Sequence, residues 1–365
     1  MSSTDLRPHA GAADYAPLWA IGLSALLIAL GFVRRQPGET AVREDDRTQF
    51  EADRGRWVDM PSEIPPRGWK DILLRVYRGI SEDRILLVAA GVTFYVLLSI
   101  FPGIATLISI YGLFADPASI ANHLDTIANV APGGAIQVLR DEMTRLASQG
   151  GTTLGLSFLI SLVISLWTTS SGVKGLFDAL NIVYKEEEKR GFLTYYVTAL
   201  AFTLAFVVFI LMSIAVVVAL PVVLNYIPLP GGTDLLVKLA RWPLLFVLVA
   251  LVLAMLYRYG PSRTRPRWRW ITWGSAFAAV VWLAASVLFS WYVENFGSYN
   301  KTYGSLGAII GFMTWIWISI IVVLVGAKLD AETEHQTARE TTSGRPKPLG
   351  TRGARMADTV GPAQG

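Results

Sequence analysis

Long apolar stretches separated by short charged segments dominate this chain. A helix of a soluble protein keeps a polar stripe for water, whereas these stretches carry almost no polar residues. A helix needs about 20 apolar residues to cross a hydrocarbon core of about 30 Å, and in lipid only a helix satisfies its own backbone groups. The seven stretches are Ala16–Val33, Ile85–Phe114, Leu154–Val173, Leu193–Leu224, Trp242–Tyr257, Ile271–Val293 and Gly304–Ala327. The pattern predicts an all-α, polytopic transmembrane helical bundle.

The stretch Ile85–Phe114 is too long for a simple span and contains Pro102 and Gly103. Proline removes a backbone donor and clashes with the preceding turn, so we expect the helix to break here. Two interpretations stay open. The span is kinked and its end protrudes, or it is a discontinuous helix whose backbone lines a transport path, as in many transporters.

An amphipathic helix is predicted between Trp69 and Arg84, where Ile72, Val76 and Ile80 recur at helical spacing among Lys and Arg residues. Such a helix lies on a membrane surface with its cations near anionic headgroups. A similar spacing within 120–146 suggests short helices at the opposite end of the bundle. Packing or lipid contact explains both segments, and a gate or lid is the alternative.

The distribution of Lys and Arg predicts the orientation. Of the 32 such residues, 26 lie in four alternate segments, namely 34–84, 174–190, 258–269 and 328–365. The positive-inside rule places these segments in the cytoplasm. We therefore expect the N-terminus outside and the C-terminus inside. Asp5 and Asp14 precede the first stretch and Arg residues follow it, which is typical of a retained signal anchor and not of a cleaved signal.

Three parts are predicted along the chain. Residues 1–68 form an N-terminal extension with one span and a cytosolic linker that is disordered by composition. Residues 69–335 form a membrane domain with six spans. Residues 336–365, rich in Gly and Pro, form a disordered cytosolic tail. The fold is thus six core spans plus one N-terminal span.

Composition supports a membrane protein and argues against an enzyme. The chain is 53% apolar and 16% charged, against roughly 25% charged in globular domains. Zero cysteines exclude disulfides and thiolate metal sites. The three histidines, His9, His123 and His335, stand in unrelated regions, without the spacing of a metal site or an acid–base pair. We expect no enzymatic activity, no cofactor and no metal.

The loop Arg263–Trp270 mixes cations with aromatic residues, as nucleic-acid platforms do. Its position at the end of an apolar stretch favours anchoring in the headgroup layer instead. We therefore predict the lipid bilayer, and no nucleic acid, as its partner.

A few polar residues in or near the spans are candidates for a substrate path, because ionisable groups in a membrane are rare and costly. Capping and snorkelling are the structural alternative. Lys174 and Asp178, one helical turn apart, are expected to pair. Ser161, Ser165 and Thr169, and Gly307 with Gly311, are assigned to helix packing. The path candidates are Lys174, Asp178, Asn181, Glu294, Asn295 and Asn300.

Several sequence blocks together resemble a known family. They are Ala89–Tyr95 with Ser99–Pro102, Trp167–Gly172 with Asp178–Tyr184, Tyr257–Pro261, and Tyr299–Gly307 with Trp315 and Gly326–Ala327. In this order they are similar to the YihY/virulence factor BrkB family of bacterial inner-membrane proteins, over about Trp69–His335. The resemblance implies six core spans in a bacterial inner membrane. One departure is Lys328, where the family pattern leads us to expect an acidic residue, whose role would fall to Asp330 or Glu332.

The resemblance implies no settled activity, since members have carried ribonuclease, serum-resistance and lipid-transport labels. We expect a transporter-like or flippase-like protein for an amphiphilic or anionic envelope substrate, such as a lipid or an envelope precursor. The alternative is a scaffold for envelope machinery that does not transport. Oligomerisation stays open.

Reporter fusions test the predicted topology. Fusions after residues 60, 182, 264 and 345 should report a cytoplasmic location, and fusions after 135, 232 and 298 an external one, because Lys and Arg alternate between these segments. A cytoplasmic signal at 135 would contradict the whole alternation.

Overall fold

The computed structural model describes residues 51, 53–112, 156–214, 233–296 and 305–364. The predicted span Ala16–Val33 and the predicted helices within 120–146 lie outside these residues. The described part is helical, and its one β-bridge joins Pro266 to Thr342. Its helices are α3 (Pro66–Glu82), α4 (Ile85–Gly112), α7 (Leu156–Val183), α8 (Phe192–Ile214), α10 (Thr233–Tyr259), α11 (Thr272–Phe296), α13 (Ser305–Glu334) and α14 (Arg355–Asp358), with 3-10 turns η1 (Pro61–Glu63) and η3 (Trp268–Trp270).

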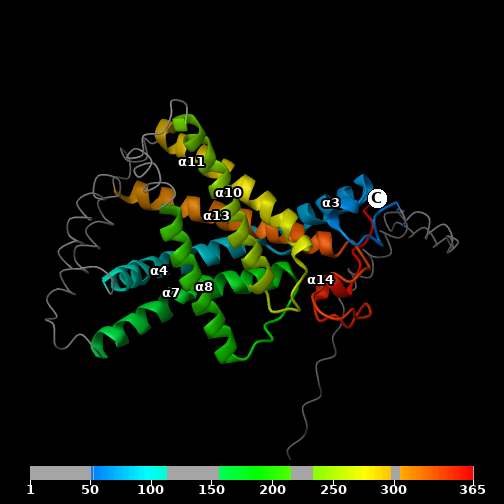
Figure 1. The fold of residues 1–365 in the computed structure, drawn as a ribbon, viewed down its shortest axis with the longest axis horizontal. Helices are drawn as coiled ribbons and strands as arrows, with labels where there is room; N and C mark the ends of the chain where they lie inside the picture. The colour runs from blue at the N-terminus through cyan, green and yellow to red at the C-terminus, as the bar shows by residue number, and fades with distance from the viewer. Residues whose placement is uncertain (1–50, 52, 113–155, 215–232, 297–304, 365) are drawn as a thin grey trace, which may run out of the picture. The chain divides into compact units, whose positions relative to one another are not determined.

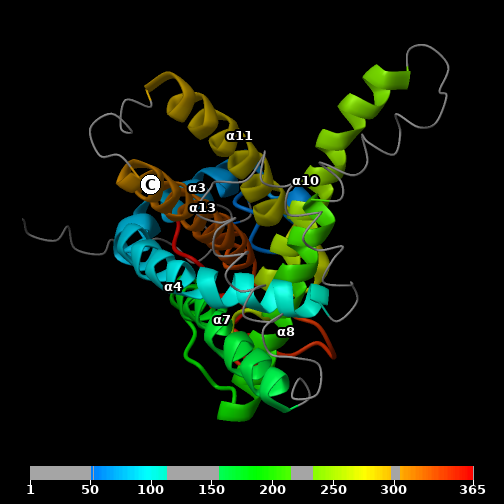
Figure 2. The same ribbon diagram turned by 90° about the vertical axis from the view of Figure 1, so that its left-hand side faces the viewer.

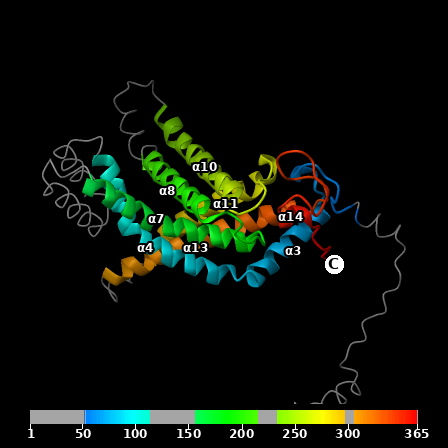
Figure 3. The ribbon, with the colours of Figure 1, turned by 90° about the horizontal axis from the view of Figure 1, so that it is seen from below.

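Helix α13 is the centre of the unit formed by residues 51–365. It contacts α11, α4, α3 and α7 along its length and α14 near its end. Figure 2 shows α13 between α11 and α4. Figures 1 and 3 show α4 beside α7, and α10 beside α11. One apolar core joins buried side chains of α4, α7, α8, α10, α11 and α13.

Four described helices are long and apolar enough to cross a membrane, namely α8, α10, α11 and α13. A fifth span results if α3 and α4 are counted as one bent pair. These helices carry many half-exposed large apolar side chains, as lipid-facing helices do. The structure thus supports a multi-pass membrane protein with four to five spans in its described part.

The interpretation of Pro102 and Gly103 as a discontinuous helix is wrong, whereas a kink at these residues stays a prediction. Helix α4 runs through Pro102 without interruption. Ser165 of α7 donates a hydrogen bond to the Pro102 carbonyl at 3.2 Å. The chain bends instead between α3 and α4, by 60°. Arg84 has a φ of 50° there, and its left-handed backbone turns the chain from α3 into α4.

Small polar residues bring α4 and α7 together, as predicted for Ser165. Ser99 of α4 lies 3.0 Å from the Ser171 hydroxyl and accepts the N–H of Gly172 at 3.0 Å. The packing role predicted for Gly311 is not seen, because a Cβ built there meets no atom within 4 Å.

The tail is ordered, contrary to our prediction of disorder after 335. Its backbone pairs with two other segments: the Ala338 N–H donates to the Arg56 carbonyl at 2.8 Å, and the Ser343 N–H to the Arg265 carbonyl at 2.8 Å. The buried Arg352 guanidinium donates to four carbonyls of the tail itself. Composition predicts disorder because the tail has little apolar surface, but hydrogen bonds to loops of the bundle hold it.

The linker before α3 is also partly ordered, from residue 53 onward. Arg54 forms an ion pair with the buried Asp71 of α3 at 2.6 Å. The Thr337 hydroxyl donates to the Val58 carbonyl at 2.9 Å. The boundary that we predicted at residue 69 therefore falls inside one packed unit.

Two glycines allow α11 and α13 to cross closely. A Cβ built on Gly274 would overlap the Gly326 carbonyl and the Asp330 carboxyl group. A Cβ built on Gly326 would lie 2.6 Å from the Ala278 Cβ. A side chain at either position would push the two helices apart, so this close contact requires glycine at both.

The Gly274→Ala variant should lose about 1–3 kcal/mol of stability, since the crossing must widen to admit a methyl group. The matched control is Gly311→Ala, which has free space and should be neutral or gain up to about 1 kcal/mol from helix propensity. Thermal unfolding of the purified variants in detergent measures both. Equal stability of Gly274→Ala and wild type would contradict the described crossing.

Candidate functional site

Buried charges gather at one end of the helices, which we call the basic end. It comprises the start of α4, the ends of α7, α10 and α13, the loops 184–191 and 260–271, and the segment after Glu334. The described parts of the four Lys- and Arg-rich segments that we assigned to one side of the membrane therefore meet at one end of the helices.

Lys328 is the centre of the first group of buried charges. Its ammonium lies 2.9 Å from Asp83 Oδ2 and 3.0 Å from Glu332 Oε1. Glu332 also accepts the Arg75 guanidinium at 2.6 Å, and Lys185 pairs with the other oxygen of Asp83. A Cβ on Gly79 of α3 would overlap the Lys328 side chain, so this glycine makes room for it.

A second group lies between the ends of α7, α11 and α13. Arg263 pairs with Glu334, and both side chains are 1% exposed. The Arg263 guanidinium covers the Tyr184 ring at 4.2 Å. Among the described residues, the Tyr184 hydroxyl has no hydrogen-bond partner of good geometry. Asp330, which is 1% exposed, accepts the Gly274 N–H at 2.7 Å through Oδ1.

Burial and neighbouring charges shift the pKa values of two side chains in this second group. Burial, and next the negative charge of Asp330, raise the pKa of the Tyr184 phenol well above its ordinary value. Burial by itself lowers the pKa of Arg263, but the carboxylate of Glu334 raises it above the ordinary value. The phenol therefore stays neutral and the guanidinium stays charged at physiological pH.

The predicted pair of Lys174 and Asp178 does not form in the described structure. The Lys174 ammonium lies over the rings of Tyr196 at 4.5 Å and Trp167 at 5.4 Å. Asp178 is exposed and accepts the Tyr195 hydroxyl at 3.1 Å. Both side chains thus contact aromatic residues of α7 and α8 instead of each other.

Asn181, the third residue predicted on that face, is buried but serves the loops. Its Oδ1 accepts the Ser262 N–H at 2.8 Å, and its Nδ2 donates to Glu188 at 3.1 Å. It thereby joins the end of α7 to the loop after α10. Three further path candidates were predicted near the end of the sixth stretch. Glu294 and Asn295 fall in the last turn of α11, and Asn300 lies outside the described residues.

We predicted that the cations of α3, Arg75 among them, face lipid headgroups and that Ile72 and Val76 form its apolar face. Ile72 and Val76 are buried, as predicted. The prediction is wrong for Arg75, because this residue is 7% exposed and its guanidinium donates to Glu332 and Gln336. Its partners come from the end of α13 and from the segment after it, about 260 residues away in sequence, so local helical periodicity gives no sign of them.

Lys328, Asp330 and Glu332 stand out in the sequence, but their burial and their ion-pair partners could not be predicted from it. Lys328, Asp330, Glu332 and Glu334 recur at every second position within the last turns of an apolar helix. Ionisable residues at the end of a span are usually assigned to snorkelling. Residues two positions apart on a helix lie on different faces. This spacing therefore predicts partners from more than one neighbouring element.

The chain matches the family model described as virulence factor BrkB over residues 76–349. The match runs from the middle of α3 into the tail, and so it covers both groups of buried charges except Arg75, which lies one residue before it. The chain belongs to this family. No solved structure matches it.

Curated relatives agree with this assignment. The protein YfkH of Bacillus subtilis (strain 168), whose name calls it ribonuclease-like, is 30% identical over 253 residues, covering 67% of this chain and 88% of the relative. A UPF0761 membrane protein of Methylibium petroleiphilum, Mpe_A1422, is 24% identical, covering 72% and 62%. Another, PSHAa0171 of Pseudoalteromonas translucida, is 26% identical, covering 71% and 85%. The family resemblance read from the sequence is confirmed.

Replacement of Arg263 by Met should be strongly destabilising in this family member. It leaves Glu334 unpaired in a dry site, which typically costs about 3–5 kcal/mol. The double variant Arg263→Met/Glu334→Gln should recover much of that loss. Unfolding in detergent across the double-mutant cycle measures the coupling energy.

The Lys174→Ala and Asp178→Ala variants supply the control cycle. No ion pair joins these side chains, so their coupling should be about 0–1 kcal/mol. Additive effects at Arg263 and Glu334 would show that this pair is solvated, contrary to its described burial.

Proposed function

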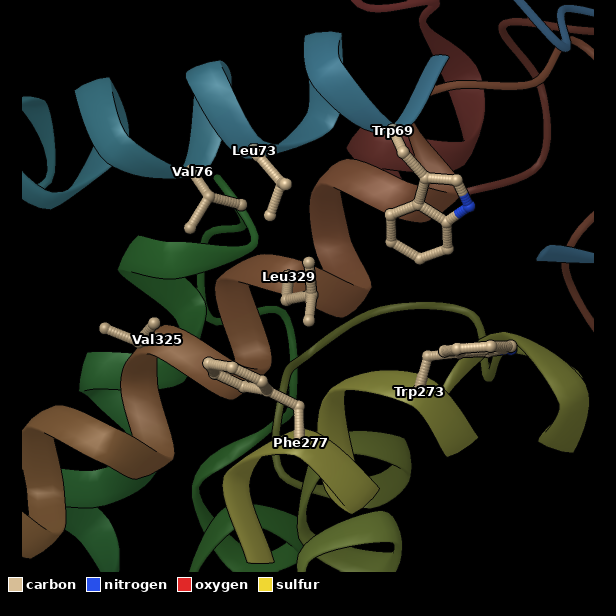
Figure 4. A pocket seen from close by; sticks show the side chains of 7 residues that line it. All are labelled: Trp69, Leu73, Val76, Trp273, Phe277, Val325 and Leu329. Atoms are coloured by element: carbon tan, nitrogen blue, oxygen red, sulfur yellow. The ribbon is translucent and has the colours of Figure 1, made fainter. Parts of the chain in front are cut away.

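We propose that this protein is a multi-pass protein of the bacterial inner membrane that moves an amphiphilic, anionic envelope lipid, and that it is not an enzyme. The observation that carries the proposal is an apolar groove between α3, α11 and α13. Its volume is about 290 Å³, and it is lined by Trp69, Leu73, Val76, Trp273, Phe277, Val325 and Leu329. Figure 4 shows these side chains converging from the three helices.

The lining fits an acyl chain better than a polar solute. All seven side chains are apolar or aromatic, and a polar solute that enters would lose hydrogen bonds to water without replacement. An alkyl chain loses nothing of this kind and gains contact with apolar walls. Two of the three walls, α11 and α13, are candidate spans, which supports a groove within reach of lipid chains.

The charge beside the groove supports an anionic headgroup. Trp69 and Trp273, whose rings are 5.5 Å apart, lie near the first turns of α3 and α11. Lys70 is exposed next to Trp69 in the chain, and Arg269 stands in the turn η3 before α11. Cations near a membrane surface favour anionic headgroups by about 1 kcal/mol each.

The orientation proposed from the sequence fits this arrangement. The basic end is the cytoplasmic end under the positive-inside rule, so the groove would take lipid from the inner leaflet. The six core spans and the added N-terminal span remain part of the proposal, with the N-terminus outside.

A scaffold for envelope machinery is the second candidate. The ordered tail favours it, because residues 336–364 and 53–65 together present a folded surface at the basic end. Under this alternative, replacing groove residues would leave function intact and tail variants would abolish it.

Lipid movement in reconstituted liposomes tests the first candidate. The wild type should move fluorescent anionic phospholipid between leaflets faster than protein-free liposomes. Leu73 is 56% exposed, and an acyl chain bound in the groove would cover it. The Leu73→Gln variant should reduce the rate about tenfold, since a polar group that an acyl chain covers loses its hydrogen bonds to water, at a cost of about 1–3 kcal/mol.

Tyr77→Gln is the matched control on the same helix, because Tyr77 is 75% exposed and does not line the groove. It should keep the wild-type rate. Equal rates for Leu73→Gln and Tyr77→Gln, or no lipid movement by the wild type, would rule out the groove as the lipid path.

A further inference from the structure

Asp330 stands at the crossing of α11 and α13 with one oxygen unused. Its Oδ1 accepts the N–H of Gly274 at 2.7 Å, one of the backbone donors that the first turn of α11 leaves without a helical partner. Its Oδ2 is buried and has no hydrogen-bond partner among the described residues. A buried carboxylate oxygen without a donor is costly, whereas the protonated group is neutral.

The charges around Asp330 do not balance the negative charge of an ionised Asp330 carboxylate. Arg263 and Glu334 act on it from the loop after α10 and from α13 itself, and they already pair with each other. The neighbours from the loop after α7 and from α10 are the phenols of Tyr184 and Tyr257. From α11 the printed contact is the Gly274 N–H. An ionised Asp330 thus gives this group a net charge of −1, and a protonated one gives zero.

The other charged side chains at the end of α13 pair with groups other than Asp330. Lys328 pairs with Asp83 and Glu332, and Glu332 pairs with Arg75. The Tyr257 hydroxyl donates to the Val323 carbonyl at 2.7 Å. Neutralising Asp330 therefore requires a proton, since the cations that approach it or share its helix already have carboxylate partners.

The groove and Asp330 lie on two sides of the same helix crossing. Trp273, Val325 and Leu329 line the groove. Their chain neighbours, Gly274, Gly326 and Asp330, form the crossing. Whatever changes the separation of α11 and α13 at the crossing also changes the width of the groove.

We propose that Asp330 is a proton-binding site and that its protonation opens the groove. A charged carboxylate holds the Gly274 N–H about twice as strongly as a neutral acid does, so proton uptake loosens α11 from α13. This inference rests on the proposed function, for which it names the proton as the coupling ion.

A fluorescent label in the groove tests the site without a transport assay. The chain has no cysteine, so Leu73→Cys gives one position for a bimane label, which contact with Trp69 and Trp273 quenches. In lipid nanodiscs, the emission should rise as the pH falls from about 9 to about 5, because the groove opens and the label leaves the tryptophans.

The Asp330→Asn variant mimics the neutral acid. Its label should show the low-pH emission at every pH, a complete loss of the titration. The control Asp53→Asn removes an exposed carboxylate, paired with Arg67 at the surface, and should titrate like the parent protein. If Asp330→Asn does not purify as a monodisperse protein, Asp330→Glu replaces it and should shift the midpoint of the titration.

Two results would overturn the proposal. Emission from the labelled parent protein that is constant between about pH 5 and about pH 9 shows that no proton acts on the groove. A titration in Asp330→Asn equal to that of the parent assigns the proton to another group. A titration lost in Asp330→Asn, with no lipid movement in liposomes, would support the proton site and reject only the lipid-transport function.

Discussion

The pairing of buried charges at the end of α13 is the constraint on which the rest of the structure depends. An isolated ion in a dry site costs several kcal/mol, so each charge needs a partner that another element brings to it. Lys328 requires Asp83 at the bend before α4, Glu332 requires Arg75 of α3, and Glu334 requires Arg263 of the loop before α11. These three requirements fix α3, α4 and the loop around one helix.

The tail and the linker complete this end of the molecule. The Thr341 hydroxyl donates to Glu334 at 2.7 Å, and the Gln364 N–H donates to Asp71 at 2.9 Å. Polar segments thus cover polar buried groups, and their order depends on hydrogen bonds and not on apolar burial. The same contacts leave α3 with its apolar face, including Leu73, turned toward α11 and α13. The groove is a consequence of how the charges hold α3.

Much of the membrane architecture could be predicted from the sequence. Apolar runs of about 20 residues have one solution in lipid, so α8, α10, α11 and α13 fall within or across the stretches read as spans. The alternation of Lys and Arg grouped the loops that meet at the basic end. The candidate site was predicted poorly, because Lys174 and Asp178 satisfy a helical spacing that any surface pair also satisfies.

The sequence by itself determined the helical class, the family and the grouping of the basic loops, since these follow from local hydrophobicity and ordered motifs. Tertiary structure decided which charges are buried and with what partner. Arg75 and Glu332 are 257 residues apart, and no local pattern joins them. It also decided that α4 continues through Pro102 while the chain bends at Arg84, because contacts with α7 and α13 outweigh the local preference of proline.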